Sequence, residues 1–169
     1  MAVEPQVFIC YGRPDKNVAH ALAAEFWRNR IECYNYMGKP VEDRLGTTLP
    51  HLSYVYCCRL FIAIISKESI SRFHVAEEIV RSEQMASLSE GFFRVHILTD
   101  VEQSPFPVPD LFVNWARSAG PAAIVKDLLY KMGAEFVEKN QKAWEINKGL
   151  YVDKWKELNS KYTGETPDA

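Results

Sequence analysis

Short runs of apolar residues alternate along the chain with longer segments in which apolar residues recur every three or four positions. The short runs predict five strands, at residues 7–11, 31–36, 59–66, 94–99 and 111–115. The run at 59–66 (RLFIAIIS) is the most apolar, which is typical of a central strand buried on both faces of a parallel sheet. Strands that alternate with helices predict an α/β fold in which helices cover both faces of a parallel sheet.

The longer segments predict the helices of this fold. The first begins near Asp15, and its inward stripe consists of Val18, Leu22 and Phe26. Further helices are expected within residues 47–58, over 71–84 and from Pro121 onward. In such sheets, ligands bind beyond the carboxyl ends of the strands. Those ends are expected at residues 11–13, 35–46 and 66–73.

The helix predicted over residues 71–84 (SRFHVAEEIVRSEQ) contains two adjacent glutamates. Neighbouring residues on a helix point about 100° apart, so the two side chains have different surroundings. The buried stripe is expected to consist of Val75, Ala76, Ile79, Val80 and Ala86. Glu77 lies nearly opposite this stripe and is expected to be solvated. Glu78 lies at its edge, on the same flank as His74, where a carboxylate could line a cleft.

From about Val137 the pattern changes to an added amphipathic segment, KAWEINKGLYVDKWKELNSKY. Its larger apolar residues lie on roughly one helical face, namely Trp144, Tyr151, Trp155, Leu158 and Tyr162. We therefore expect a domain over residues 1–137 and a C-terminal helical extension over 138–169, which ends in a disordered tail. The extension either packs back onto the domain or leads to a downstream domain, such as a sensor, in a longer protein.

Composition narrows the class of protein. A length of 169 residues with 47% apolar residues is typical of one globular domain, and a net charge of −2 argues against nucleic acid as a direct ligand. The four cysteines, Cys10, Cys33, Cys57 and Cys58, form no C-x-x-C pair, so we expect buried, reduced thiols and no metal. The start MAVEPQ is unlike a signal peptide, and no apolar run is long enough to cross a membrane, so a cytoplasmic protein is expected.

The sequence resembles the Toll/interleukin-1 receptor (TIR) domain family in four segments, which occur in the family's order. They are VFICYGRPD, GKPVEDRLGTTL, LFIAIIS and SRFHVAEEIV. The resemblance extends from about residue 6 to residue 136. The first segment resembles the family's F-I-S-Y start, with Cys10 in place of the serine. The last resembles the helix in which a glutamate is followed by an aliphatic residue. The resemblance implies a flavodoxin-like three-layer sandwich with a five-stranded parallel sheet, followed here by the helical extension.

The resemblance implies one of two functions. Many TIR domains are non-enzymatic modules that signal by homotypic association, through a loop that corresponds here to residues 37–46. Others, including bacterial effectors of immune or antiphage defence, cleave NAD⁺ at the nicotinamide–ribose bond. They release nicotinamide and form ADP-ribose or a cyclic isomer, and they often complete the site by self-assembly. In the enzymes the helix glutamate is catalytic, and it matches Glu78. Their usual tryptophan, four residues earlier, is His74 here.

NAD⁺ cleavage needs little catalytic machinery and no cofactor, because NAD⁺ is itself the substrate. Nicotinamide leaves as a neutral group, so one carboxylate that stabilises the oxocarbenium-like ribose is sufficient. Arg13, Lys39 and Arg44 are candidates to bind the diphosphate. Tyr11 and Tyr36 could stack on the rings of the substrate. His74 could stack in place of the tryptophan, or donate a hydrogen bond to Glu78.

Each candidate also has a purely structural interpretation. Glu78 could be a solvated carboxylate that pairs with Arg81 or Ser82. Arg13 could pair with Asp15. The cations Lys39 and Arg44 could solvate a loop or form contacts between TIR domains, and Tyr11 and Tyr36 could simply pack. A third class of protein, an unrelated doubly wound domain such as a response regulator, would need a cluster of aspartates at the end of the first strand, which this sequence lacks.

Overall fold

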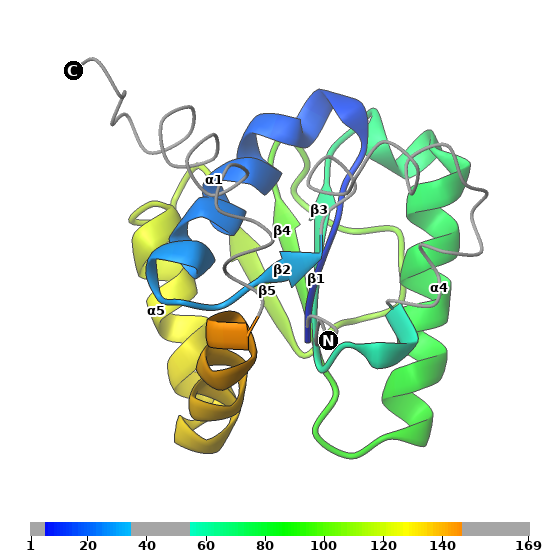
Figure 1. The fold of residues 1–169 in the computed structure, drawn as a ribbon. Coiled ribbons are helices and arrows are strands. Elements are labelled where there is room, and N and C mark those ends of the chain that lie inside the picture. Colours follow the sequence, from blue (N-terminus) through cyan, green and yellow to red (C-terminus); the bar gives the residue numbers. More distant parts are fainter. Residues whose placement is uncertain (1–5, 35–54, 147–169) are drawn as a thin grey trace.

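The structure is a computed structural model and describes residues 6–34 and 55–146 (Figure 1). The strands are β1 (Val7–Cys10), β2 (Cys33–Tyr34), β3 (Leu60–Ile65), β4 (Phe93–Leu98) and β5 (Leu111–Asn114). The helices are α1 (Lys16–Arg28), α4 (Phe73–Leu88), α5 (Pro121–Met132) and a further helix at residues 134–146, and residues 55–57, within the predicted helical segment 47–58, are helical as well. Short 3₁₀ turns, η1 (Arg13–Asp15) and η3 (Ser69–Ser71), precede α1 and α4.

The five strands form one parallel sheet in the order β2-β1-β3-β4-β5, so the predicted α/β, flavodoxin-like architecture is confirmed. Helices α1 and α5 cover one face of the sheet and α4 covers the other (Figure 1). From β1 the chain continues to β2 on one side of β1 in the sheet, and it later forms β3 on the other side of β1. The strand order therefore reverses between β1 and β3, and α/β proteins of this kind bind ligands at the carboxyl side of that point.

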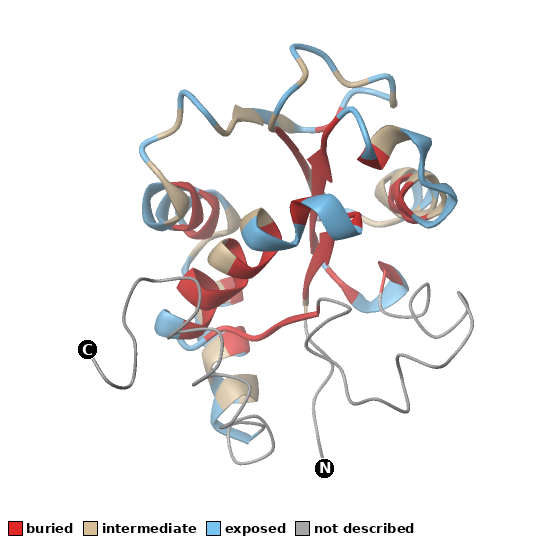
Figure 2. Cartoon of the chain, turned by 90° about the horizontal axis from the view of Figure 1, so that it is seen from above, coloured by how far each residue is buried: buried red, intermediate tan, exposed pale blue. Residues whose placement is uncertain are grey.

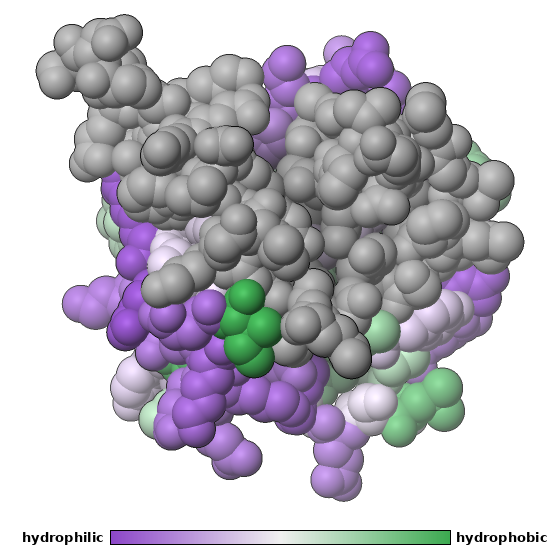
Figure 3. Space-filling view, viewed as in Figure 1, coloured by the Kyte–Doolittle hydropathy of each residue, from purple (hydrophilic) through white to green (hydrophobic). Residues whose placement is uncertain are grey.

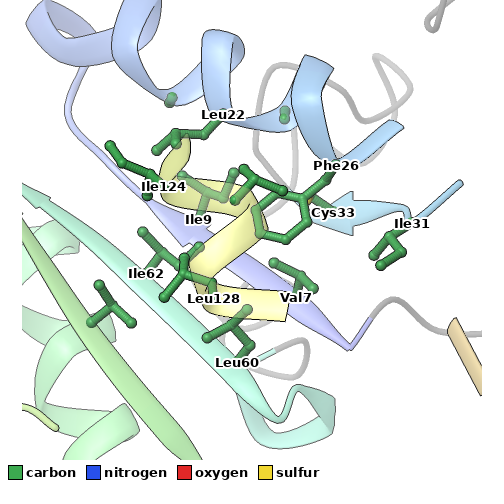
Figure 4. Close-up of a cluster of buried hydrophobic side chains, with 14 of the residues drawn as sticks. Val7, Ile9, Leu22, Phe26, Ile31, Cys33, Leu60, Ile62, Ile124 and Leu128 are labelled. Carbon is green, nitrogen blue, oxygen red and sulfur yellow. The ribbon is translucent and has the colours of Figure 1, made fainter. Parts of the chain in front are cut away.

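Side chains that alternate along each strand build a separate core on each face. Val7 and Ile9 of β1 pack with α1 and α5, whereas Phe8 and Cys10 pack under α4. Figure 4 shows the first core, where Leu22 and Phe26 of α1 and Leu128 of α5 surround Val7, Ile9, Leu60 and Ile62. Every residue of β3 is buried, as the apolar run at 59–66 predicts, because β3 is central and covered on both faces (Figure 2).

The helix at residues 134–146 packs against the domain. The ring of Trp144 meets that of Trp27 edge to face, with centroids 6.1 Å apart. Asn140 is buried and its side-chain amide donates to Gln6, while the amide of Gln141 donates to the carbonyl of Asn29. The predicted boundary at residue 137 falls within this helix. The remainder of the expected extension, with Tyr151, Trp155, Leu158 and Tyr162, lies outside the described residues.

Cysteine placement differs in part from the expectation. Cys10, Cys33 and Cys58 are buried and Cys57 is exposed, and all four are free thiols. The expectation of burial is therefore wrong for Cys57, which is helical and exposed beside Tyr56, whereas Cys58 follows the helical residues and packs in the core under α4. Within residues 6–34 and 55–146, no helix is long and apolar enough to cross a membrane. The described atoms visible in Figure 3 form a mostly hydrophilic surface with isolated apolar spots.

Replacing Trp144 by Ala tests whether the helix at 134–146 stabilises the domain. We expect the free energy of unfolding to fall by roughly 2–4 kcal/mol, because the variant loses the buried part of the indole and its edge-to-face contact with Trp27. Urea unfolding followed by circular dichroism measures the change. Tyr130→Ala, an exposed aromatic on α5, is the control and should change stability by less than about 0.5 kcal/mol. Equal effects of the two substitutions would contradict this packing role.

Candidate functional site

Glu78 of α4 is a buried carboxylate near the point where the strand order reverses. Its residue is only 7% exposed, and burial raises the pKa of Glu78 to about 8. The negative charge of Glu77 raises it further, and a hydrogen bond from the Cys10 thiol lowers it. No described cation forms an ion pair with this carboxylate or lowers its pKa. A buried carboxylate without a cationic partner is held largely protonated at neutral pH.

The structure corrects the predicted buried stripe of α4. The buried residues are Val75, Glu78, Ile79 and Ser82, while Val80 is 45% exposed and Ala76 is half-buried. The prediction assumed that apolar residues define the inward face. Instead the helix is rotated so that Glu78 replaces Val80 on the face that contacts the sheet. Glu78 therefore lies deeper than the edge position expected for it, and Glu77 is half-buried rather than solvated.

The alternative prediction, that Glu78 is a solvated carboxylate paired with Arg81 or Ser82, is wrong. The Ser82 hydroxyl donates to the backbone carbonyl of Ile79 at 2.6 Å, and the Arg81 guanidinium donates to Gln84 at 3.2 Å. Neither side chain pairs with the glutamate. The carboxylate is therefore not a solvated member of a surface ion pair.

Cys10 lies beneath the same part of α4. It ends β1 with its side chain on the α4 face, and its Sγ donates to the backbone carbonyl of Val75 at 3.7 Å. Val75 precedes Glu78 by nearly one helical turn, and helical side chains lean toward the preceding turn. Burial, followed by the charge of Glu78 and its hydrogen bond, raises the pKa of the Cys10 thiol well above its ordinary value. The thiol is therefore a protonated donor at physiological pH.

A buried hydrogen bond joins the two loops at this edge of the sheet. The Ser66 hydroxyl, directly after β3, donates to Oδ2 of Asp15 at 2.6 Å. The backbone N–H of Ser66 donates to the Ser69 hydroxyl, and the backbone N–H of Ser69 donates to the Ser66 hydroxyl. Burial raises the pKa of Asp15, and the Ser66 hydrogen bond opposes that rise. The loops after β1 and β3 are thus tied together within the protein interior.

Sequence reasoning missed this link between Asp15 and Ser66. Asp15 directly precedes α1, as the sequence predicts, but its side chain makes no capping hydrogen bond. The only feature of the sequence that points to this link is that Asp15 and Ser66 are both polar and each follows a buried strand. It also follows that Asp15 is not the partner of Arg13. Arg13 is exposed on η1 and forms no ion pair with a described residue, which leaves its guanidinium accessible at the rim.

Arg72 is a second cation at this rim and was not predicted. Its aliphatic part lies against Gly12, where a Cβ would meet its Cδ at 3.6 Å. Its guanidinium is 4.0 Å from the carboxylate of Glu68, at the limit of an ion pair. The positive charge of Arg72 also lowers the pKa of Asp15. Arg13 and Arg72 therefore place two positive charges on the loops after β1 and β3, where the carboxylates of Glu68 and Asp100 also lie near Asp15.

His74 connects α4 to the end of β1. Its Nε2 lies 3.3 Å from the backbone carbonyl oxygen of Tyr11, while the residue itself is exposed at the start of α4. His74 is not among the groups that shift the pKa of Glu78. The predicted hydrogen bond from His74 to Glu78 is therefore not present. Phe73, beside it, is 78% exposed and presents an aromatic surface at the same end of the helix.

The structure separates Tyr11 from Glu78. The Tyr11 side chain lies in the core on the α1 face, where its hydroxyl is 3.5 Å from Nε2 of His20. Successive strand residues point to opposite faces, so Tyr11 and Cys10 cannot both face α4. The backbone carbonyl oxygen of Tyr11, by contrast, lies 3.3 Å from Nε2 of His74 at the start of α4. Three further candidates, Tyr36, Lys39 and Arg44, lie outside the described residues, as does the expected loop at 37–46.

No side-chain cluster in the described part of the chain, residues 6–34 and 55–146, could hold a metal ion. Comparisons with known proteins found no family model that matches the chain and no curated protein of significantly similar sequence. The family resemblance of the sequence therefore stays a prediction. The geometry itself assembles a buried carboxylate, a buried thiol and a rim that carries two arginines at the carboxyl ends of β1 and β3.

Replacing Glu78 by Gln tests the stability effect of the buried carboxylate. The pKa of Glu78 is about 8 in the folded protein and near 4.5 in the unfolded chain, so the folded state retains this proton between these values while the unfolded chain releases it. The contribution of Glu78 to stability is therefore full below pH 4.5 and falls as the pH rises to 8.

We expect the free energy of unfolding of the wild-type protein to fall, relative to that of Glu78→Gln, by on the order of 3 kcal/mol between pH 5 and pH 8. The difference in Tm between the two proteins should grow by roughly 5–10 °C over the same range. Calorimetry at the two pH values measures it, and Glu77→Gln is the matched control. A constant Tm difference between wild type and Glu78→Gln across this pH range would show that Glu78 is solvated.

Proposed function

We propose that the chain is a TIR-type NAD⁺ glycohydrolase or cyclase, with Glu78 as its catalytic residue. The observation that carries the proposal is the buried Glu78 carboxylate, which no described cation neutralises and which lies near the point where the strand order reverses. A residue whose pKa is strongly shifted at such a position is a candidate for catalysis. Fold alone does not imply function, so the proposal rests on this site and on the resemblance of the sequence.

The proposed reaction breaks the bond between the nicotinamide nitrogen and C1′ of ribose. The bonding electron pair stays with nicotinamide, which becomes neutral, and positive charge develops on the ribose ring. Ionised Glu78 stabilises this charge in a site of low polarity, where electrostatic interactions are strong. Attack of water at C1′, with loss of a proton, gives ADP-ribose, and attack by another group of the same molecule gives a cyclic isomer. Bound NAD⁺ itself favours ionised Glu78, because the pyridinium is cationic.

The proposed substrate contacts differ in how well the geometry supports them. Arg13 is exposed at the rim without an ion pair to a described residue, which supports a role in binding the diphosphate. His74 lies at the start of α4 beside the exposed ring of Phe73, and either ring could stack on the substrate. The Tyr11 side chain faces the opposite core and does not support a stacking role. Lys39, Arg44 and Tyr36 stay candidates on the resemblance alone.

The resemblance also supports the wider setting of the proposed activity. Self-association of TIR domains would complete or activate the site, and a sensor domain in a longer protein would trigger it. A cytoplasmic role in immune or antiphage defence is part of the same proposal. The alternative is a non-enzymatic TIR module that signals by homotypic association alone. The two functions differ in one measurable property, the turnover of NAD⁺.

Incubation with NAD⁺ tests the proposal directly. We expect nicotinamide release by the wild-type protein, at low or at high protein concentration, with ADP-ribose or a cyclic isomer as second product in chromatography. Glu78→Gln should reduce the rate at least about 100-fold, since it removes the charge that stabilises the transition state. Glu77→Gln, the neighbouring carboxylate, should keep its turnover. Absence of turnover at every concentration would favour the interaction module instead.

The pH dependence of nicotinamide release gives a second test. If ionised Glu78 is the active form, kcat/KM rises about tenfold per pH unit below pH 8 and levels off above it, because the pKa of free Glu78 is about 8. The acid limb of kcat should lie at lower pH, since bound NAD⁺ favours the carboxylate. Rates are corrected with Glu78→Gln as the blank, because NAD⁺ itself decomposes in alkali. A rate that is independent of pH from 6 to 9 would exclude this role.

A further inference from the structure

His96 of β4 is a buried imidazole without a hydrogen-bond partner. The residue is 0% exposed, and neither Nδ1 nor Nε2 makes a hydrogen bond to a described residue. Because Val95 and Ile97 belong to the core under α1 and α5, strand alternation places His96 on the α4 face. There its ring meets those of Phe106 and Phe112 edge to face, with centroids 6.5 and 5.9 Å apart. Such surroundings favour the neutral ring, because protonation would add a charge and a second N–H donor without an acceptor.

Residues 99–110, which connect β4 to β5, cover this imidazole. Phe106 packs against the core under α4, and Pro109 is the only buried residue of the segment. The Arg94 Nη2 donates to the Val108 carbonyl at 3.0 Å. The backbone N–H of Arg94 donates to Oδ2 of Asp110 at 2.8 Å, and that of Asp110 donates to the Arg94 carbonyl at 3.0 Å. Val108 and Asp110 are exposed, so these bonds can open locally without unfolding of the sheet.

Arg94 is the charged group of the described residues that acts on His96. It lies two residues earlier on the same face of β4, and its Nε and Nη1 are also buried without an acceptor. Burial, followed by the charge of Arg94, lowers the pKa of His96 from 6.5 to about 4. Neither β3 nor β5, which flank β4, carries a titratable residue.

Other titratable groups surround His96 without stabilising its charged form. Those of residues 99–110 and of α4 are Asp100, Glu102, Asp110, His74, Glu77, Glu78, Arg81 and Glu83. None of them shifts the pKa of His96 appreciably. No described carboxylate is therefore in place to stabilise an imidazolium at this position.

We propose that residues 99–110 form a proton-gated cover, which stays closed over the neutral imidazole of His96 and is held open when His96 takes up a proton from the solvent. Opening comes first, because the closed segment separates the ring from water. Closing then requires the proton to leave, since otherwise a second positive charge is buried beside Arg94. Opening also withdraws Phe106 from the core under α4, so acid exposes an aromatic surface there. This inference does not depend on the proposed NAD⁺ cleavage.

The linkage between protonation and opening gives the effect a sign and a size. His96 has a pKa of about 4 when the cover is closed and its ordinary value of 6.5 when the ring is solvated. Above pH 6.5 neither form is protonated, and the closed form is fully favoured. As the pH falls from 6.5 to 4, only the open form gains protons. The opening constant should therefore rise about 20-fold between pH 7 and pH 5.

Amide hydrogen exchange measured by NMR tests the proposal. The reporters are the backbone N–H groups of Arg94 and Asp110, whose hydrogen bonds hold the segment, with each rate divided by the intrinsic rate at the same pH. We expect the roughly 20-fold rise in the wild type and less than about a twofold rise in His96→Phe, which keeps an aromatic ring but cannot take up a proton. His20→Phe, at a buried histidine of α1, is the matched control and should retain the wild-type rise.

The amides of β3 separate local opening from global unfolding. Their exchange should not rise between pH 7 and pH 5, because protonation of Glu78 stabilises the whole fold over this range. If His96→Phe does not fold, the wild-type imidazole is titrated by NMR, and we expect its midpoint below about pH 5.

Three results would each overturn the inference. They are the same pH dependence in the wild type and in His96→Phe, an equal rise at the amides of β3, and an imidazole midpoint near the ordinary value of 6.5.

Discussion

Desolvation of the Glu78 carboxylate is the constraint on which the candidate site depends. Burial between α4 and the sheet raises the pKa of Glu78 to about 8 without a compensating cation among the described residues. A glutamine or an apolar residue at this position would avoid that loss of stability. Natural proteins retain such costs where function requires a destabilised group, and a carboxylate in a site of low polarity interacts strongly with developing positive charge. The same burial explains both the unfavourable contribution to folding and the proposed catalytic strength.

The surrounding loops are held by contacts that do not depend on Glu78. The hydrogen bond between Ser66 and Asp15 joins the segments that follow β1 and β3, and His74 joins α4 to the carbonyl of Tyr11. These links lie beyond the last paired residues of β1 and β3, Cys10 and Ala63, so they continue the connection between the two strands past the end of the sheet pairing. A site on rigidly held loops keeps its geometry when a ligand binds. The exposed Arg13 and Phe73 are thus carried by a well-supported frame.

Much of the fold could be predicted, whereas the site could be predicted only in part. All five strands lie where the apolar runs predict them, and α5 begins at Pro121 as expected. The choice of Glu78 over Glu77 agrees with its burial, yet the predicted stripe wrongly included Val80. That error arose because the helical wheel assumes that apolar residues face inward, and a buried carboxylate violates the assumption. The orientation of Tyr11 could have been read from strand alternation once Cys10 was placed under α4.

By itself, the sequence determined which segments are strands and helices, because apolar periodicity reports local backbone geometry and burial together. It also determined that the sheet is parallel, since strands alternate with helices. Only the tertiary structure decided the surroundings of each polar side chain. The thiol of Cys10 meets the turn that precedes Glu78 across 65 residues of chain, and Ser66 meets Asp15 across 51. Such pairings depend on sheet register and helix rotation, which no local pattern encodes.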